Sequence, residues 1–232
     1  MKRLYTRVET RVADRGWDIA LDGKPMRTPG KNEFVVPSAA LAAAIAAEWD
    51  AQREEIRPAT MPVTRLAATA IDWTAAQRDL VVDEIAKYAA TDLVCYRADH
   101  PPGLAARQQA VWQPLVDWAR LRYDAALAVT TGIIPATQSP ATLRAFGAIV
   151  AAQDDFRLTA LHTLTAASGS LVIALALTEG RLDAEAAFAA SQLDETFQIE
   201  AWGEDVDAAV RRRALAADIA AAAGFIALLA AR

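Results

Sequence analysis

The N-terminal part of the chain alternates between polar and apolar side chains, which is the period of β-strands. Residues 5–12 alternate roughly in this way and are rich in β-branched side chains, which favour strands. Residues 16–21 and 24–28 flank Asp22-Gly23, a pair that strongly favours a two-residue hairpin turn. A further short run, residues 33–36, follows a turn. The pattern predicts a small β-rich region.

The period then changes to that of a helix. Leu41, Ile45 and Trp49 recur at helical spacing, and Ser38 stands where a helix N-cap is expected. Residues 57–62 contain two prolines, which end this helix. We place the domain boundary there.

Beyond this break, apolar residues recur three and four positions apart, as in helices that bury one face. The predicted helices cover residues 62–71, 75–90, 104–122, 140–151, 156–178, 184–202 and 205–230. The expected fold class is α+β. A small N-terminal β-rich domain with one helix (residues 1–60) is followed by a larger all-helical domain (residues 61–232).

Several residues indicate where these helices begin and end. Ser139 and Asp183 are good N-caps, and Gly180 is a good C-cap for the helix before it. Two short segments, residues 93–96 and 127–130, form either a small strand pair or extended linkers.

Composition argues against a membrane protein. Hydrophobic residues make up 54% of the 232 positions, but much of this is alanine, the best helix former. The apolar window of residues 214–231 contains Asp218 and lacks the Leu, Ile and Phe density of a membrane span. Residues 1–10 carry charges without an apolar core, so we expect no secretory signal and no membrane insertion.

Charge and cysteine content exclude further classes. A net charge of −5 is unsuited to nucleic-acid binding, which needs a basic surface. The single cysteine, Cys95, cannot form an internal disulfide and fits a reducing cytoplasm. Three consecutive arginines, residues 211–213, are explained equally well by a solvated helix face and by a binding role. We expect a cytoplasmic protein.

Catalytic groups are sparse. The two histidines, His100 and His162, belong to no cluster with metal-ligand spacing, and no glycine-rich nucleotide loop occurs. The adjacent carboxylates Asp154 and Asp155 stand at a predicted helix start, where negative charge stabilises the helix dipole. We therefore predict no catalytic residue, no metal and no cofactor.

The small residues Ser168-Gly169-Ser170 could suggest a nucleophile. They lack the strand-then-helix setting of a nucleophile elbow. We interpret them instead as residues that allow two helices to approach closely.

The most informative segment is acidic and aromatic, residues 193–205. Spacing places Glu195, Ile199 and Trp202 on one side of a helix. Gly203 can end that helix, and the two carboxylates that follow favour the start of the next one. The pattern alone fits an ordinary corner between helices as well as a binding surface.

Sequence blocks along nearly the whole chain resemble those of the assembly chaperones that hold the free alpha subunit of the F-type ATP synthase. Each block is weak alone, but so many in one order are specific. In chain order they are Gly16-Trp17, Leu21-Asp22-Gly23-Lys24-Pro25, Arg27-Thr28-Pro29, Val36-Pro37-Ser38-Ala39-Ala40-Leu41-Ala42, Glu48-Trp49-Asp50-Ala51-Gln52, Met61-Pro62-Val63-Thr64-Arg65-Leu66-Ala67, Thr91-Asp92-Leu93-Val94-Cys95-Tyr96-Arg97, Ser168-Gly169-Ser170 and Gln198-Ile199-Glu200-Ala201-Trp202-Gly203-Glu204-Asp205.

The resemblance implies a β-rich domain joined to a larger helical one and a binding activity without turnover, cofactor or nucleotide. It further implies that the partner is the free alpha subunit, shielded on the face that later contacts the beta subunit. Without a mitochondrial presequence, the chain is similar to bacterial members working in the cytoplasm, and we expect a monomer.

The same resemblance suggests the binding residues. Trp202 is the expected apolar anchor, with Glu204 and Asp205 as charged contacts and Glu195 and Glu200 as further members. Two structural alternatives stay open. Trp202 could be a core residue near a helix end, and the carboxylate at position 204 could serve only the next helix.

Two other functional classes remain open. One is a small carboxylate-dependent enzyme that uses Asp154, Asp155 and Glu204; it requires that these side chains share a cleft. The other is a generic helical adaptor, which would recover partners other than the synthase.

Overall fold

The computed structural model describes residues 2–132 and 135–231. The chain forms two compact units. Unit 1 contains Met1–Arg78, Asp154–Ala160 and Gly224–Arg232, and unit 2 contains Asp79–Gln153 and Leu161–Ala223. A small N-terminal sheet precedes a larger helical part, which confirms the α+β fold class. The predicted domain boundary after residue 60 stays a prediction.

Unit 1 contains a small antiparallel sheet. Val8 faces Leu21 and Ala13 faces Gly16 across the first hairpin. The backbone φ angle is positive at Asp22 (49°) and Gly23 (79°), as a tight hairpin turn requires, which confirms the predicted turn. The strands are β1 (Val8–Ala13), β2 (Gly16–Leu21), β3 (Lys24–Pro25) and β4 (Val35–Val36), with β1, β3 and β4 all paired to β2.

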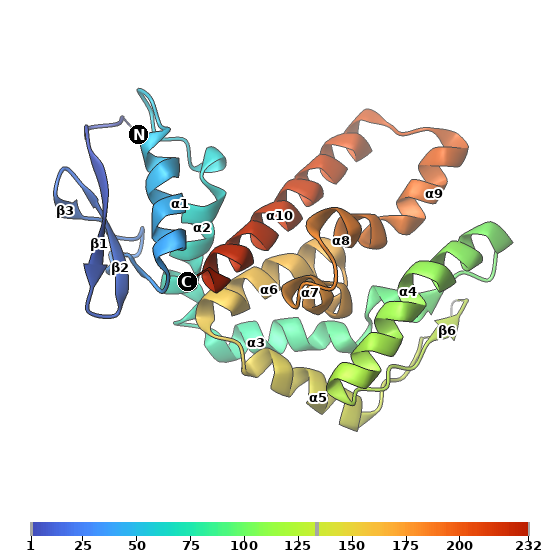
Figure 1. Cartoon of the computed structure of the whole chain (residues 1–232). Coiled ribbons are helices and arrows are strands. Elements are labelled where there is room, and N and C mark those ends of the chain that lie inside the picture. Colours follow the sequence, from blue (N-terminus) through green and yellow to red (C-terminus); the bar gives the residue numbers. More distant parts are fainter. Residues whose placement is uncertain (1, 133–134, 232) are drawn as a thin grey trace. The chain divides into compact units, whose positions relative to one another are not determined.

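Helix α1 (Ala39–Asp50) packs on this sheet, against β1 and β2 (Figure 1). Its residues Leu41 and Ile45 are completely buried. The Ser38 hydroxyl accepts a hydrogen bond from the Leu41 N–H at 3.1 Å, which confirms the predicted N-cap. The same hydroxyl donates to the Leu228 carbonyl at 2.7 Å and so ties the start of α1 to the C-terminal part of the unit.

The next helix, α2 (Pro62–Thr69), is capped by a side chain from α1. The Glu48 carboxylate accepts from the Val63 N–H at 2.8 Å and from the Thr64 N–H at 2.7 Å. A carboxylate is favourable there because the free N–H groups and the helix dipole both attract negative charge. The predicted helix 62–71 does not end at residue 71 but continues as a π-helical turn, Ala70–Thr74.

Asp72 in this π-helical turn holds the loop after β3. Its carboxylate accepts from the Gly30 N–H at 2.7 Å, from the Asn32 side-chain amide at 2.8 Å and from the Thr28 hydroxyl. Burial acts to raise the pKa of Asp72, but these hydrogen bonds outweigh it, so the pKa lies below its usual value. A Cβ atom at Gly30 would lie only 2.7 Å from the Asp72 carboxyl carbon.

We therefore expect Gly30→Ala to lower the free energy of unfolding by about 2 kcal/mol, because the added methyl displaces a carboxylate held by three hydrogen bonds. Urea denaturation measures the change. Gly147→Ala is the matched control, since Gly147 lies inside a helix and an added methyl there would meet no neighbouring group of the described residues within 4 Å. That variant should be neutral or more stable by up to about 1 kcal/mol. Equal effects at the two positions would contradict the crowding argument.

The rest of the chain is mainly helical. A parallel strand pair, β5 (Tyr96–Arg97) with β6 (Thr130–Thr131), lies among the helices of unit 2, so the short extended segments do form a strand pair. The most buried helix of unit 2 is α7, in which all side chains from Leu171 to Leu177 are buried. The helices are α3 (Arg78–Lys87), α4 (Pro102–Tyr123), α5 (Pro140–Ala151), α6 (Asp155–Ser168), α7 (Leu171–Thr178), α8 (Ala184–Ser191), α9 (Leu193–Trp202) and α10 (Val206–Ala230).

Three of the predicted caps are confirmed. The hydroxyl of Ser139 accepts from the Thr142 N–H at 3.0 Å, and the carboxylate of Asp183 accepts from the Ala186 N–H at 2.8 Å. Gly180 has a φ of +73°, and its N–H bonds to the Leu177 carbonyl at the end of α7.

Two predicted helices are each divided in the structure. The predicted helix 156–178 is broken at Gly169, where φ is +68°, and Ser170 then caps α7 by accepting from the Ile173 N–H. The predicted helix 184–202 is broken at Gln192. A Cβ atom at Gly169 would meet nothing in the described part of the chain within 4 Å, so the interpretation of this glycine as a close-approach site is wrong. It ends a helix instead.

Asp92 organises the centre of unit 2. The side chain is completely buried and accepts from the Val94 N–H at 3.2 Å, the Val172 N–H at 3.0 Å and the Ser170 hydroxyl at 2.5 Å. Burial raises the pKa of Asp92 to about 6, although the hydrogen bonds act in the opposite direction. Two sequence blocks that carry the family resemblance, far apart in the chain, meet at this carboxylate.

Candidate functional site

The acidic and aromatic segment forms the corner between α9 and α10 (Figure 1). Gly203 has a φ of 83°, and its N–H bonds to the Ile199 carbonyl at 2.8 Å, so it ends α9 as predicted. The Asp205 carboxylate accepts from the Ala208 N–H at 2.9 Å and caps the start of α10. The sequence pattern thus identified both helix ends at this corner.

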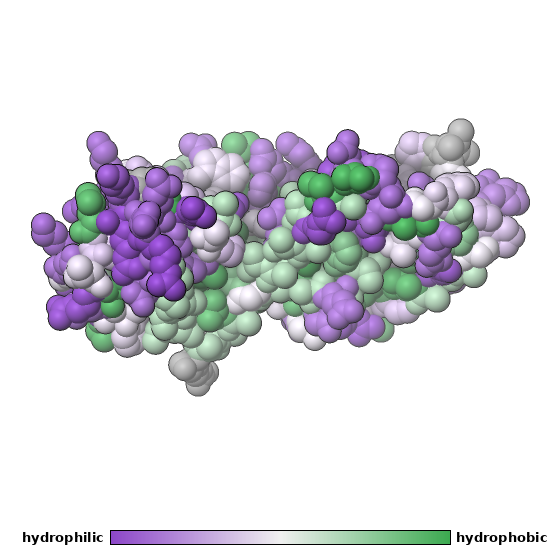
Figure 2. All heavy atoms as spheres, turned by 90° about the horizontal axis from the view of Figure 1, so that it is seen from above, coloured by the Kyte–Doolittle hydropathy of each residue, from purple (hydrophilic) through white to green (hydrophobic). Residues whose placement is uncertain are grey.

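Large apolar side chains are exposed at this corner. Trp202 is 81% exposed, Val206 79% and Val210 52%. Trp112, by contrast, is completely buried. The structure therefore excludes the core alternative for Trp202. Figure 2 shows that strongly hydrophobic side chains, drawn as dark green spheres, lie among hydrophilic ones on the face seen from above.

The predicted carboxylates lie on the same segment. We call this set the corner surface; its members are Glu195, Glu200, Trp202, Glu204, Asp205, Val206 and Val210. The Glu200 carboxylate lies 2.7 Å from the guanidinium of Arg107, and that of Glu204 lies 3.1 Å from Arg212. Glu195 is exposed. Two of the four carboxylates are thus in ion pairs within the chain.

Helix α4 contacts both α8 and α9. The Gln108 amide donates to the Asp194 carboxylate at 2.8 Å, and the Trp112 indole N–H donates to the Ala190 carbonyl at 2.8 Å. The Arg107 guanidinium lies 5.1 Å from the centre of the Phe197 ring. The sequence pattern did not reveal these supporting residues, because Gln108 and Asp194 are 86 positions apart and no local spacing reports such a contact.

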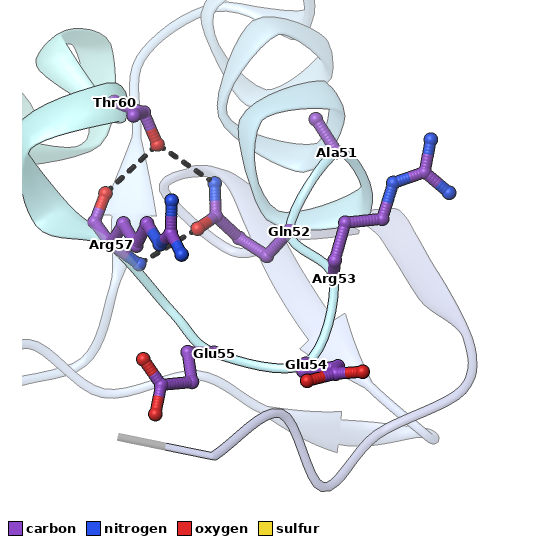
Figure 3. A pocket seen from close by; sticks show the side chains of 7 residues that line it. All are labelled: Ala51, Gln52, Arg53, Glu54, Glu55, Arg57 and Thr60. Atoms are coloured by element: carbon purple, nitrogen blue, oxygen red, sulfur yellow. Dashed lines mark hydrogen bonds between the residues drawn. The ribbon is translucent and has the colours of Figure 1, made fainter.

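A hollow in unit 1 lies at the turn between α1 and α2 (Figure 3). Gln52 bridges it by donating to the Thr60 hydroxyl at 3.2 Å and by accepting from the Arg57 N–H at 2.8 Å. In Figure 3 the charged side chains of Arg53, Glu54 and Glu55 point in different directions. A catalytic cleft needs converging polar groups, and this hollow does not have that arrangement.

The other candidate chemical groups have structural partners. Asp155 forms an ion pair with Arg78 at 2.5 Å, and Asp154 accepts from the Arg157 N–H at 2.9 Å, so this pair serves the start of α6 as predicted. Burial raises the pKa of the Cys95 thiol to about 12, which makes it unreactive. Within residues 2–132 and 135–231, no group of three or more His, Cys, Asp or Glu could hold a metal ion.

Helix α10 is the one helix in the described part of the chain that is long and apolar enough to cross a membrane. The mean hydropathy of its most apolar 18-residue window is 1.7, and 22% of that window is buried. Length and composition alone are weak evidence for a membrane span, and the helix contains charged residues at positions 211–213 and at Asp218. The expectation of no membrane insertion stays a prediction.

The fold is that of known assembly chaperones, as comparison with solved structures shows. The chain superimposes on the crystal structure of Atp12 from Paracoccus denitrificans with a TM-score of 0.96 and 42% identity, covering 98% of both chains. A variant of that protein in which an aspartate is replaced by lysine also matches with a TM-score of 0.96 and 42% identity, over 98% of this chain and 97% of that one. A structure from Agrobacterium tumefaciens, described as a candidate chaperone, matches with a TM-score of 0.91 and 41% identity, over 98% of this chain and 86% of that one.

Sequence comparison gives the particular family. The profile of the ATP12 chaperone protein family matches residues 2–120, and the chain therefore belongs to this family. The mitochondrial protein atp12 of Schizosaccharomyces pombe is 23% identical over 219 residues, which cover 89% of this chain and 75% of the relative. Members of the family are chaperones of ATP synthase assembly and not enzymes. This finding confirms the family resemblance and removes the small-enzyme alternative.

Proposed function

We propose that the chain binds the unassembled alpha subunit of the ATP synthase catalytic sector through the corner surface. The bound chaperone covers the face of the alpha subunit that later contacts the beta subunit. Membership of an ATP synthase assembly family supports a synthase subunit as the partner. The observation that carries the choice of surface is the 81% exposure of Trp202.

An exposed tryptophan is unusual on a surface that binds nothing. Large aromatic side chains bury more apolar area than other residues, and they dominate the energetics of protein interfaces. Val206 and Val210 extend the apolar surface along α10, where they stand four positions apart and share one face. We infer that these three side chains form the apolar centre of the interface.

The carboxylates surround this apolar centre with negative charge. Such groups at the rim of an interface act on association rate and specificity more than on affinity. Asp205 and Glu195 are exposed carboxylates, and a partner with basic side chains is suited to them. Glu200 and Glu204 belong to the same surface as members of ion pairs.

General physical chemistry explains why the alpha subunit needs to be covered and how the chaperone releases it. An unassembled subunit exposes an apolar face that aggregates unless it is covered. Release then occurs by competition, so the chaperone has to bind the alpha subunit more weakly than the beta subunit does. We propose that the chain works as a cytoplasmic monomer without a cofactor.

Co-purification tests this function. The tagged chain is co-expressed with the alpha subunit alone, or with both alpha and beta subunits. We expect the alpha subunit to co-purify in near-stoichiometric amount when expressed alone, and its recovery to drop when beta is present. Recovery of the beta subunit alone, or of unrelated proteins in place of synthase subunits, would support the adaptor alternative and contradict the proposal.

A further inference from the structure

The carboxylate of Glu204 does not stand free on the corner surface. Its Oε1 atom lies 3.1 Å from Nε of Arg212, and both side chains are partly shielded from solvent, with exposures of 33% for Glu204 and 19% for Arg212. A carboxylate already engaged by an arginine has less capacity to bind a basic group of a partner. This geometry raises the question of what Glu204 does.

Arg212 reaches three parts of unit 2 at once. Besides Glu204 in the corner, both terminal nitrogens lie 3.3 Å from the hydroxyl of Thr196 in α9. The guanidinium also lies 5.5 Å from the centre of the Phe188 ring in α8, a distance at which a cation and an aromatic face attract. One side chain on α10 therefore connects α8, α9 and the turn between α9 and α10.

These contacts fix the turn that presents Trp202. Local hydrogen bonds fix only the two helix ends, from the Gly203 N–H to the Ile199 carbonyl and from the Ala208 N–H to the Asp205 carboxylate. The residues between them are exposed. An arginine is suited to this position, since its planar guanidinium offers several donors in fixed directions. A lysine offers a single ammonium and could not make all three contacts together.

We propose that Arg212 and Glu204 are positioning residues that hold the α9–α10 turn in the geometry that exposes Trp202, and that Glu204 acts through Arg212 instead of contacting the partner. This proposal deepens the function proposed above and rests on it. The proposal gives a specific role to Arg212, one of the three consecutive arginines. A solvated helix face alone does not account for its contacts with Glu204, Thr196 and Phe188. Trp202 and the two valines keep the direct contacts.

A charge swap separates positioning from direct contact. Glu204→Lys places two positive groups together, and we expect it to weaken binding of purified free alpha subunit about tenfold. The double variant Glu204→Lys with Arg212→Glu restores an ion pair of reversed direction. If Glu204 acts through Arg212, the double variant recovers part of the lost affinity, because the ion pair returns while the contacts of Arg212 with Thr196 and Phe188 do not. If Glu204 contacts the partner, position 204 still carries the wrong charge and affinity stays low.

Hydrogen exchange of the chaperone alone gives a readout that does not depend on the partner. We expect faster amide exchange at residues 203–206 in Glu204→Lys and a return toward the wild-type rate in the double variant. Arg212→Lys should be intermediate, because it keeps the charge but loses the fork of donors. Circular dichroism establishes that each variant is folded.

The outcomes distinguish the two proposals. A folded double variant with wild-type exchange and no recovery of binding would overturn the positioning role while leaving the surface assignment intact. Wild-type affinity in Glu204→Lys would overturn it as well. If Trp202→Ala binds the alpha subunit normally, the proposed surface itself fails, whatever the swap shows.

Discussion

Replacing Trp202 by alanine is expected to weaken binding of the free alpha subunit by about 30-fold or more. Truncating an anchor residue at the centre of an interface costs about 2 kcal/mol or more, and this energy corresponds to that factor. The side chain is 81% exposed, so its removal leaves no cavity in the free protein. Titration of purified alpha subunit against the two forms, followed by calorimetry or fluorescence anisotropy, measures the ratio.

Leu121→Ala is the matched control. Leu121 is also an apolar side chain of 81% exposure in unit 2, but it lies on α4 and outside the corner surface. It should change affinity by less than about twofold, because exposed side chains outside an interface contribute little. Equal losses from both substitutions would show that general surface hydrophobicity, rather than the corner surface, determines capture.

The largest expected effect on stability comes from Asp92. Asp92→Ala removes the acceptor of three buried donors, the amides of Val94 and Val172 and the hydroxyl of Ser170. Each unsatisfied buried donor costs about 1–3 kcal/mol, so we expect a loss of about 3 kcal/mol or more in the free energy of unfolding. Chemical denaturation at neutral pH measures it.

Asp183→Ala provides the comparison for this effect. Asp183 also accepts from a helix N–H, but its carboxylate is exposed, and water can replace it. Its removal should cost about 1 kcal/mol. If Asp92→Ala is no more damaging than Asp183→Ala, the buried network does not organise unit 2 as described.

The pKa of Asp92 also predicts a pH dependence. Because burial raises this pKa to about 6, above the value of about 3.8 in the unfolded chain, the folded protein binds an additional proton between these values. This stabilising contribution is complete below about pH 4 and is lost as the pH rises to about 6. The stability difference between wild type and Asp92→Asn should fall over this range, by an amount on the order of 3 kcal/mol. A difference that is flat or rises with pH would contradict the raised pKa.

Local signals in the sequence were sufficient for much of the fold. The Asp-Gly turn, the serine and aspartate caps and the glycine helix ends depend on the backbone within four residues, so short motifs encode them. Gly203 and Asp205 belong to this group, which is why the corner was correctly located. The family resemblance then added the function class, which the pattern alone could not give.

Contacts between residues far apart in the chain cannot be predicted from local sequence motifs. An isolated glycine in an apolar run, such as Gly169, fits both a packing role and a helix end, and only its positive φ decides between them. The pairs Arg107 with Glu200 and Arg212 with Glu204 depend on how three helices pack. Sequence alone therefore predicted which carboxylates lie at the corner but not that two of them are held within the chain.

These ion pairs change how charge variants at the corner are interpreted. A reversed charge at Glu204 removes a support of the turn as well as any contact with the partner, so loss of binding in that single variant does not identify an interface residue. Trp202 has no such ambiguity, because its side chain is mostly in solvent. The anchor is therefore the more informative position for locating the interface.

Hydrogen exchange of the chaperone with and without purified free alpha subunit tests the central claim most directly. The account predicts slower exchange on binding at residues 195–210, with little change at the β1–β2 hairpin of unit 1. No protection anywhere, or protection confined to segments outside residues 195–210, would contradict the claim that the corner surface binds the alpha subunit.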